Sequence, residues 1–538
     1  RSTLFPYTTL FRSPYRIEQV VVTGSRISRP DFTADSPIVS LTDETFQRVA
    51  ATSVEQVLNA MPQFVPSVTT TSNNPSNNGQ ANIDLRGLGT NRNIVLMNSR
   101  RLPIANADGT VDVNVIPTAL IERVDIVTGG ASAVYGSDAI AGVVNFVLQD
   151  DFEGVDIESS YGKTGEDDSE EWTAGLTLGS NFADDQGNAV FHIGYTERKP
   201  VLQGARDFSF MALDVRRQGN APLGSGTFEQ GRATFGANAP NQAVIDQVFG
   251  AYGNYTAGSV GPSRALGTNP DGSLFSAGAG IPNQPVVNFR GDIDPAFNPL
   301  IYTYNFSPPN ILNMPVDRYN FASFLDFDLS DDVEAYAHAI YTDYDTRTQL
   351  APTPAGGLQV PVTNPFIPAD LATILASRAN PNGNFTFARR MTEVGPRISR
   401  NEYKVWQFLG GVRGDVGDDY RWDVFAAKAQ MDLRETQDND LSLARIDELL
   451  NAPDGGMALC GGFDPFGAGR VSPGCADYVR TFFTNTTRVD QTLAEASFSG
   501  KLFQMPAGTA QFSVGTGYHE DALDRKSTRL NSSHPYRS

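Results

Sequence analysis

The chain has 538 residues and is strongly acidic, with 41 Lys and Arg against 61 Asp and Glu and a formal net charge of -20. This balance argues against a nucleic-acid-binding protein, because phosphate binding requires clustered basic residues. Hydrophobic residues make up only 40%, beside 50 Gly and 33 Pro, which is meagre for several dense cores. The longest nearly apolar run, 139–148, is far shorter than the ~20 residues of a membrane helix, so any contact with a bilayer is expected to use strands.

Both ends of the chain are expected to be artefacts. Residues 2–13 and 524–534 are the translations of two common short-read sequencing adapters, so the segments 1–13 and 524–538 are set aside. The reading frame is therefore expected to be cut at both ends, and the lack of a signal peptide is attributed to this truncation.

Residues 14–153 are predicted to form short mixed elements of an α+β unit. Ser53 is expected to cap a helix over 54–60, with Gln56 in the capping-box position and Pro62 ending it. A helical turn is expected at 117–121. The expected strands are 20–23, 37–41, 83–85, 93–97, 122–128 and 143–148.

The pattern changes after residue 153 to a two-residue alternation in segments of about ten residues. In one of them Tyr319 and Phe321 share a face opposite Asn320 and Asp326, which is typical of a barrel with an apolar exterior and a polar interior. The nine segments are 154–162, 171–179, 189–198, 318–329, 332–344, 402–414, 419–433, 488–503 and 508–519. Aromatic residues near segment ends fit interfacial girdles: Trp172, Tyr195, Tyr341, Tyr344, Trp406, Tyr420 and Trp422.

The connections between these segments distinguish an outer-membrane barrel from a soluble β-sandwich or solenoid. Tight turns fall near 330, 416 and 504–507, whereas three connections are very long and are expected to lack regular structure: 199–317, 345–401 and 434–487. Such loops are unusual in a compact soluble domain, while short turns at one end and long loops at the other are typical of outer-membrane barrels. Since nine strands cannot close a barrel of this kind, an incomplete one is expected.

Only two cysteines occur, Cys460 and Cys475, in a Gly- and Pro-rich segment. In an oxidising compartment they are expected to form a disulfide. Two thiols without a nearby His are a weak candidate for a metal site, and no metal is predicted.

Three motifs in order resemble the TonB-dependent receptors. They are 17–27 (IEQVVVTGSRI), 84–103 (DLRGLGTNRNIVLMNSRRLP) and 116–148, which is similar to the family's block of IERV, GG, YGS and GVVN. The chain departs from the family where Asn98-Ser99 replaces the usual Asp/Asn-Gly turn. The resemblance implies a transducer-binding segment and linker at 14–36, a plug domain at 37–153, and a partial transmembrane β-barrel at 154–523.

The candidate site residues follow from these motifs. An exposed β-branched segment can add as an edge strand to a partner's sheet, and this role is favoured over the alternative that the segment is simply the first strand of the plug. The residues expected to bind the inner-membrane energy transducer are Glu18, Gln19, Val20, Val21, Val22, Thr23 and Gly24. The glycines expected to permit tight turns and close backbone approach in the plug are Gly87, Gly89, Gly129, Gly130, Gly136 and Gly142. Tyr135 belongs to the same plug motif.

Three plug charges, Arg86, Glu122 and Arg123, are expected to be buried and paired between plug and wall, with a solvated surface position as the alternative. Specificity for the solute is expected to lie at the plug apex, in 71–82 and 104–113, and in the long loops.

The function implied by the resemblance is an energy-coupled outer-membrane receptor and importer for a scarce solute such as an oligosaccharide or a siderophore. A non-transporting receptor or adhesin and a barrel hydrolase are the alternatives, but HExxH and Gly-x-Ser-x-Gly motifs are absent from the sequence, so no enzyme is predicted. The expected partners are a TonB-type transducer, outer-membrane lipid and lipopolysaccharide, and the solute. No cofactor and no nucleic acid are expected, and the location is the outer membrane of a Gram-negative bacterium.

Overall fold

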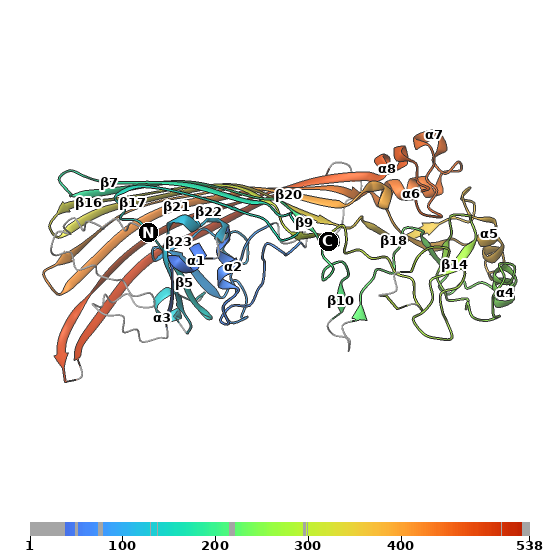
Figure 1. Ribbon diagram of the computed structural model, residues 1–538, viewed down its shortest axis with the longest axis horizontal. Helices are drawn as coiled ribbons and strands as arrows, with labels where there is room; N and C mark the ends of the chain where they lie inside the picture. The colour runs from blue at the N-terminus through green and yellow to red at the C-terminus, as the bar shows by residue number, and fades with distance from the viewer. Residues whose placement is uncertain are drawn as a thin grey trace, which may run out of the picture.

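The computed structural model describes residues 38–48, 52–73, 79–129, 131–136, 138–214, 221–293, 297–298, 300–506 and 508–529. A long, curved antiparallel sheet forms a wall, and a small α+β unit lies under one half of it (Figure 1). A third unit, built from the long connections, lies at the other end of the wall (Figure 1). No helix among these residues is long and apolar enough to cross a membrane.

The α+β unit, here called the plug, is built on a five-stranded sheet of order β1-β4-β5-β2-β3, in which only β2 and β5 are parallel to each other. Its strands are β1 Ile38–Thr42, β2 Asn93–Met97, β3 Arg100–Arg101, β4 Ile121–Val127 and β5 Gly142–Leu148. Its helices are α1 Asp43–Arg48, α2 Val54–Leu58, η2 Val113–Val115, η3 Thr118–Leu120 and α3 Ser132–Tyr135.

Most predicted plug elements are confirmed, with two differences. Helix α2 begins after Ser53, but the Ser53 hydroxyl makes no capping hydrogen bond and the helix ends at Leu58, short of Pro62. The expected strand at 83–85 is a single bridge between Leu85 and Phe64. The expected strand at 20–23 lies outside the described residues.

All nine predicted wall strands are confirmed, and they form one antiparallel sheet of order β23-β22-β21-β20-β17-β16-β8-β7-β6. The strands are β6 Gly154–Gly162, β7 Glu171–Phe182, β8 Gly187–Arg198, β16 Val316–Ser330, β17 Val333–Leu350, β20 Arg397–Val416, β21 Tyr420–Leu441, β22 Arg480–Met505 and β23 Gly508–Arg529. Within the described residues β6 and β23 pair on one side only, so the wall is an open, incomplete barrel.

The two faces of the wall differ as the alternation predicted. On β16 the side chains of Arg318, Asn320 and Phe324 are buried against the plug, whereas Tyr319 and Leu325 are exposed. Aromatic pairs on the outer face lie at two levels, the tilted pair Tyr195–Tyr319 and the stacked pair Phe182–Phe327. Phe327 lies eight residues after Tyr319 on β16, a distance of about 27 Å along the strand at ~3.4 Å per residue. Because barrel strands are tilted, the two levels are about 20 Å apart along the barrel axis.

Tyr344 is an exception to the predicted girdle. Its side chain is 1% exposed and faces the plug, because it shares the inward-facing side of β17 with Ile340 and Thr342. An error of one residue in the predicted register assigns a side chain to the opposite face of the strand. An aromatic residue that faces inward can then be mistaken for a girdle residue.

The long connections are not structureless, contrary to expectation. Segments from 199–317 and 345–401 pair into a five-stranded sheet of order β14-β13-β12-β19-β18. Together with helices from 434–487 they enclose a separate hydrophobic core that includes Phe249, Leu371, Phe387 and Leu449. The prediction failed because these strands are only three to seven residues long, too short to show a period.

The elements of this loop unit come from all three connections. The strands are β9 Val201–Leu202, β10 Leu213–Asp214, β11 Ala221–Pro222, β12 Arg232–Thr234, β13 Leu266–Thr268, β14 Leu274–Ser276, β15 Ile311–Asn313, β18 Pro354–Val360 and β19 Phe385–Arg390. The helices are η4 Gln203–Ala205, α4 Gln242–Gly250, α5 Ala369–Ala376, η5 Thr392–Val394, α6 Leu443–Asn451, α7 Met457–Cys460 and α8 Pro473–Val479. The predicted disulfide is formed between Cys460 and Cys475, joining α7 to α8.

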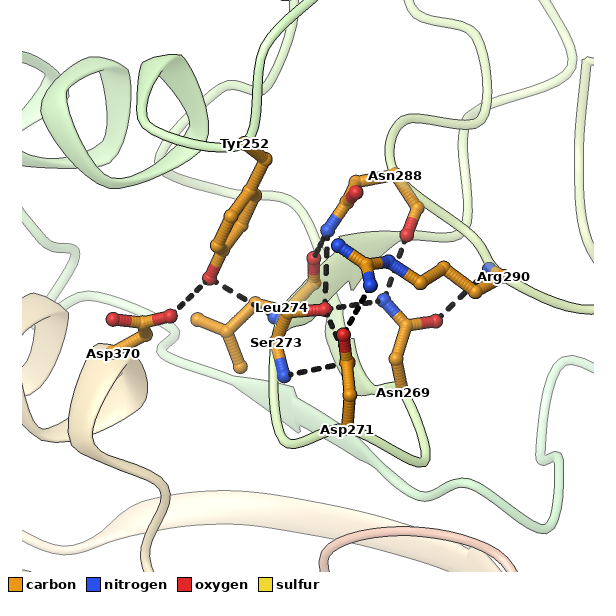
Figure 2. A network of polar contacts seen from close by, with 8 residues as sticks. All are labelled: Tyr252, Asn269, Asp271, Ser273, Leu274, Asn288, Arg290 and Asp370. Atoms are coloured by element: carbon orange, nitrogen blue, oxygen red, sulfur yellow. Dashed lines mark hydrogen bonds and ion pairs between the residues drawn. The ribbon is translucent and has the colours of Figure 1, made fainter.

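A polar network ties the β13–β14 hairpin to its neighbours (Figure 2). The Asn269 amide donates to the carbonyl of Asn288 at 2.7 Å, and Arg290 forms an ion pair with Asp271. The Tyr252 hydroxyl accepts the Leu274 N–H at 3.1 Å and donates to Asp370 at the start of α5. These contacts join the hairpin to α5 and to the segment at 288–290.

Candidate functional site

The plug and the wall share one hydrophobic core. Plug residues such as Ile116 and Phe146 belong to the same buried cluster as the wall residues Phe324, Tyr403 and Val405. The plug is therefore packed against the wall and is not merely tethered to it. Inside this apolar interface lies a set of buried charged and polar groups, which is the candidate functional site.

Arg318 of β16 reaches from the wall into the plug. It is 2% exposed and donates to the carbonyl oxygen of Thr52 at 2.7 Å, and to the carbonyl and side-chain oxygens of Asn114 at 3.4 and 3.3 Å. Its inward position follows from the alternation of β16. A single wall side chain thus joins two separate segments of the plug.

Arg198 of β8 lies beside Arg318 at the same interface. Its Nε donates to the carbonyl of Met314 at 2.8 Å, and an Nη donates to the hydroxyl of Thr52 at 3.4 Å. Glu171 of β7 lies 3.9 Å from the same guanidinium. Two buried arginines from neighbouring strands therefore face the plug at Thr52.

Glu55 of α2 supplies a buried carboxyl group on the plug side. It is 1% exposed, and neither carboxylate oxygen has a hydrogen-bond partner among the described residues. Burial raises the pKa of Glu55 to about 7, and the positive charge of Arg198 opposes the shift. The carboxyl group is therefore poised to change charge near neutral pH.

Asp112 of the plug is the second buried acid. Its carboxylate accepts the N–H groups of Ala81 at 2.9 Å and Asn114 at 3.1 Å, and the hydroxyl of Tyr344 from the wall. Burial raises the pKa of Asp112, while the hydrogen bond from Tyr344 opposes the rise. The Tyr344 ring stacks on Tyr403 with centroids 4.4 Å apart. This packing fixes the position of the Tyr344 hydroxyl beside Asp112.

A further contact joins the turn after β2 to the wall. Arg100 forms an ion pair with Asp423, donates to the Tyr336 hydroxyl at 2.7 Å and lies 4.1 Å from the centroid of Phe425. The turn itself is Asn98-Ser99, and both residues have positive φ, 45° and 64°. The turn thus keeps the left-handed geometry usually supplied by Asn-Gly, although Ser has a Cβ that disfavours it.

The three charged residues that were predicted to be buried do not belong to this buried set. Arg86 and Glu122 are exposed and Arg123 is half-buried, with Glu122 at 3.1 Å and Asp125 at 3.6 Å from its guanidinium. The expectation of burial between plug and wall is therefore wrong for Arg86 and Glu122. The pair at 122–123 lines a cavity of about 1640 Å³ between plug and wall that also includes Asp331 beside a tight turn, because plug and wall stand apart there.

The remaining predicted residues are placed as follows. Gly87, Gly89 and Gly136 have φ of 68°, 109° and 94°, which supports the expected tight turns. The carbonyl of Tyr135 accepts from Arg101 at 2.7 Å. Gly129 follows β4 without a positive φ. Gly130 and the segment Glu18–Gly24 lie outside the described residues.

Sequence reasoning missed the acids and arginines that do meet. Arg198 and Arg318 occupy inward positions of predicted strands, where a charge requires a partner. This inward placement of two arginines was a signal that the sequence already contained. A second such signal was the carboxylate of Glu55, which lies beside Val54 among the buried residues of α2. No group of three metal-ligating side chains lies together in the described ranges.

A plug held by buried contacts against an open β-barrel wall is the arrangement of a plugged β-barrel. Residues 30–143 match the model of the TonB-dependent Receptor Plug Domain family. The chain therefore carries the plug domain of a TonB-dependent receptor. Plug domains of this family belong to transporters and not to enzymes, in agreement with the sequence prediction.

Solved receptors align with most of the chain at low identity. The ferric enterobactin receptor of Pseudomonas aeruginosa is 12% identical, with 91% of this chain and 59% of that one covered and a TM-score of 0.35. The ferric-catecholate import receptor of E. coli K12 is 10% identical over 92% and 67%, also at 0.35. The siderophore receptor of Acinetobacter baumannii is 11% identical over 91% and 62%, at 0.35. The chain thus spans about 59% of the length of the enterobactin receptor.

Proposed function

We propose that this chain is the plug and part of the barrel of an energy-coupled importer in the outer membrane of a Gram-negative bacterium. Its solute is a scarce hydrophilic compound such as an oligosaccharide or a siderophore. The observation that carries this proposal is the plug held on the wall by buried polar contacts at Arg318 and Asp112. Such contacts hold a closed state firmly, but each can be exchanged for a hydrogen bond to water when the plug moves.

The exposed apolar outer face supports a membrane location. Val155 and Ile157 on β6, Phe408 on β20 and Val514 on β23 are exposed by 59% to 75% on outward-facing positions. Such residues are stable in contact with lipid but costly in contact with water. Lipid and lipopolysaccharide are therefore proposed as the surroundings of the wall.

Solute binding at the loop unit has a structural route to the plug. The N–H of Met314, just after β15, donates to the plug carbonyl of Thr70 at 2.8 Å, and the Asn73 amide donates to the carbonyl of Ile311 at 2.7 Å. The carbonyl of Met314 also accepts from Arg198. A shift of β15 on solute binding would therefore pull on the plug apex and on the buried arginine together.

Energy coupling is proposed to act through the segment Glu18–Gly24, which would add as a strand to a TonB-type transducer. The test expresses the complete receptor in a Gram-negative host and measures energy-dependent uptake of a panel of labelled oligosaccharides and ferric siderophores. Deleting residues 17–24 is expected to abolish uptake while leaving solute binding to cells intact. Undiminished uptake after the deletion would refute energised import.

A matched pair of point variants sharpens this test. Val21→Pro removes a backbone N–H that strand addition requires, whereas Val21→Thr keeps the N–H and the β-branched shape. Loss of uptake in Val21→Pro with retention in Val21→Thr is the expected pattern. Equal loss in both variants would point to side-chain recognition and contradict strand addition.

A further inference from the structure

The wall holds the plug unevenly. On β17, β20 and β21 the inward side chains at the level of the plug are largely apolar and belong to the core that plug and wall share. They include Ile340, Tyr344, Tyr403, Val405 and Met431. Separating plug from wall on this side would expose all of them to water, which is strongly unfavourable.

The inward positions of β6, β7 and β8 have the opposite character. Among the described residues of these strands, only Val190 belongs to the shared core. Gly175 and Gly194 pair directly with each other, and on either side they pair with Glu158 and Asn320. The wall therefore has a row across it in which two neighbouring inward side chains are missing and the flanking ones are polar.

A cavity of about 220 Å³ lies between this part of the wall and the plug. Its walls include Asp43, Thr118 and Gln149 from the plug and Glu158, His192 and Thr196 from the wall. Arg318 also lines it, and the Nε of Arg318 has no hydrogen-bond partner among the described residues. Since one water occupies roughly 30 Å³ in the liquid, this polar cavity has room for several.

Among the described residues, few direct hydrogen bonds are seen between the plug and β6–β8. The Thr52 hydroxyl lies 3.3 Å from Glu171 and 3.4 Å from Arg198 toward the loop end of the strands. Toward the tight turns the Asn188 amide donates to the carbonyl of Phe152, the residue that leads into β6. Between these two points the plug and the wall are separated by the cavity.

We infer that the plug parts from the wall along β6–β8, and that this cavity is the start of the solute's path past the plug. The inference rests on the proposed import function. Polar surfaces that already contain water can separate by admitting more water, whereas the side formed by β17–β21 cannot do so without exposing apolar groups.

The lining also selects a solute class. Its polar groups are carboxylates, hydroxyls and amides, with the guanidinium of Arg318. A neutral solute with many hydroxyl groups can exchange hydrogen bonds with these groups along the path. The structure thus favours a neutral oligosaccharide over a ferric siderophore.

The order of opening can be measured with two matched cysteine variants of the complete receptor. Thr196→Cys lies on the cavity and Thr342→Cys on the side formed by β17–β21, where the Thr342 hydroxyl donates to the carbonyl of Val115. Both threonines are buried, at 7% and 1% exposure, and the native cysteines are bonded to each other. Within this chain, a charged maleimide therefore reports on the introduced thiol.

In purified receptor titrated with urea below global unfolding, the Thr196→Cys thiol is expected to react at a lower urea concentration and several-fold faster than the Thr342→Cys thiol. Equal rates, or faster reaction at Thr342→Cys, would overturn the inference. If Thr196→Cys does not fold, Thr173→Cys on β7 lines the same cavity and replaces it.

Uptake separates this inference from the proposed function. In cells, a bulky maleimide attached at Thr196→Cys is expected to stop uptake of a labelled neutral oligosaccharide, whereas uptake that continues despite the label would refute the path. A parent receptor that imports no solute of the panel would refute the import function, while the urea series still reports which side opens first. Import of a ferric siderophore alone would refute the solute class.

Discussion

Tyr344 of the wall donates its hydroxyl to Asp112 of the plug, and these two residues are more than two hundred positions apart in the chain. Both side chains are almost fully buried, at 1% and 3% exposure. The bond joins a strand of the wall to the segment just before η2, and the same carboxylate also holds two plug N–H groups. Plug closure therefore depends on a hydrogen bond whose acceptor has no access to bulk water.

Replacing Tyr344 with Phe is expected to loosen the plug by about 1–3 kcal/mol, because a buried acceptor loses its donor. The measurement is hydrogen exchange of plug amides, for example at Ala81 and Asn114, which should speed up. Tyr341→Phe is the control, since among the described residues the Tyr341 hydroxyl on the outer face bonds only to Asp343 at 3.0 Å. Equal acceleration in both variants would mean that the Asp112 contact has no special role.

The pH dependence of plug stability should carry a contribution from Glu55. Its pKa rises from the ordinary 4.5 to about 7 in the folded plug because of burial, so the folded state binds the proton more tightly than the unfolded state. The stabilisation is fully present below pH 4.5 and is lost as the pH rises to about 7, with a change on the order of 3 kcal/mol.

Glu55→Gln should remove this part of the pH dependence, and urea unfolding of the plug between pH 4.5 and 7.5 would measure it. The exposed Glu44 on α1 provides the control variant, Glu44→Gln, which should leave the slope unchanged. A Glu55→Gln variant with the same slope as the parent would contradict the assignment.

Reduction of the Cys460–Cys475 disulfide is expected to destabilise the loop unit locally. The bond closes a loop with a sequence separation of 15, and a loop of that size contributes about 3 kcal/mol in the chain-entropy model. Protease sensitivity of α6–α8 should increase, while amide exchange in the middle of β17 should not change. Equal loosening of β17 would show that the loop unit and wall unfold together.

Gly142→Ala should destabilise the plug more than a left-handed backbone alone explains. A Cβ at this position would collide with the carbonyl of Val127 and with the Leu85 side chain, where β5 pairs with β4. Gly109 also has a positive φ, 85°, but a Cβ there meets nothing.

Thermal unfolding of the two alanine variants separates these effects. Gly109→Ala is expected to cost about 1–2 kcal/mol, from the left-handed conformation alone. Gly142→Ala is expected to cost about 2–4 kcal/mol, since a steric clash is added. Equal losses would refute the close approach.

The wall and most of the plug could be predicted from the sequence because their signals are local. An alternation such as Tyr319, Asn320 and Phe321 records that successive residues of one strand face different surroundings. The nine strands were therefore found where the structure has them, and the run at 93–97 was found as β2. The disulfide was equally accessible, because the chain has only two cysteines.

Only the tertiary structure decided which groups meet across the plug and the wall. Glu55, Arg198 and Arg318 come from three segments that no local pattern connects, and their burial depends on how the plug is seated. That the glycines at 175 and 194 are paired, and together leave a gap in the inward side chains, is visible only when the two strands are aligned in register. The sheet of the loop unit was hidden for the same reason, since pairing between distant short segments depends on register and packing, and neither is encoded in the period of a single segment.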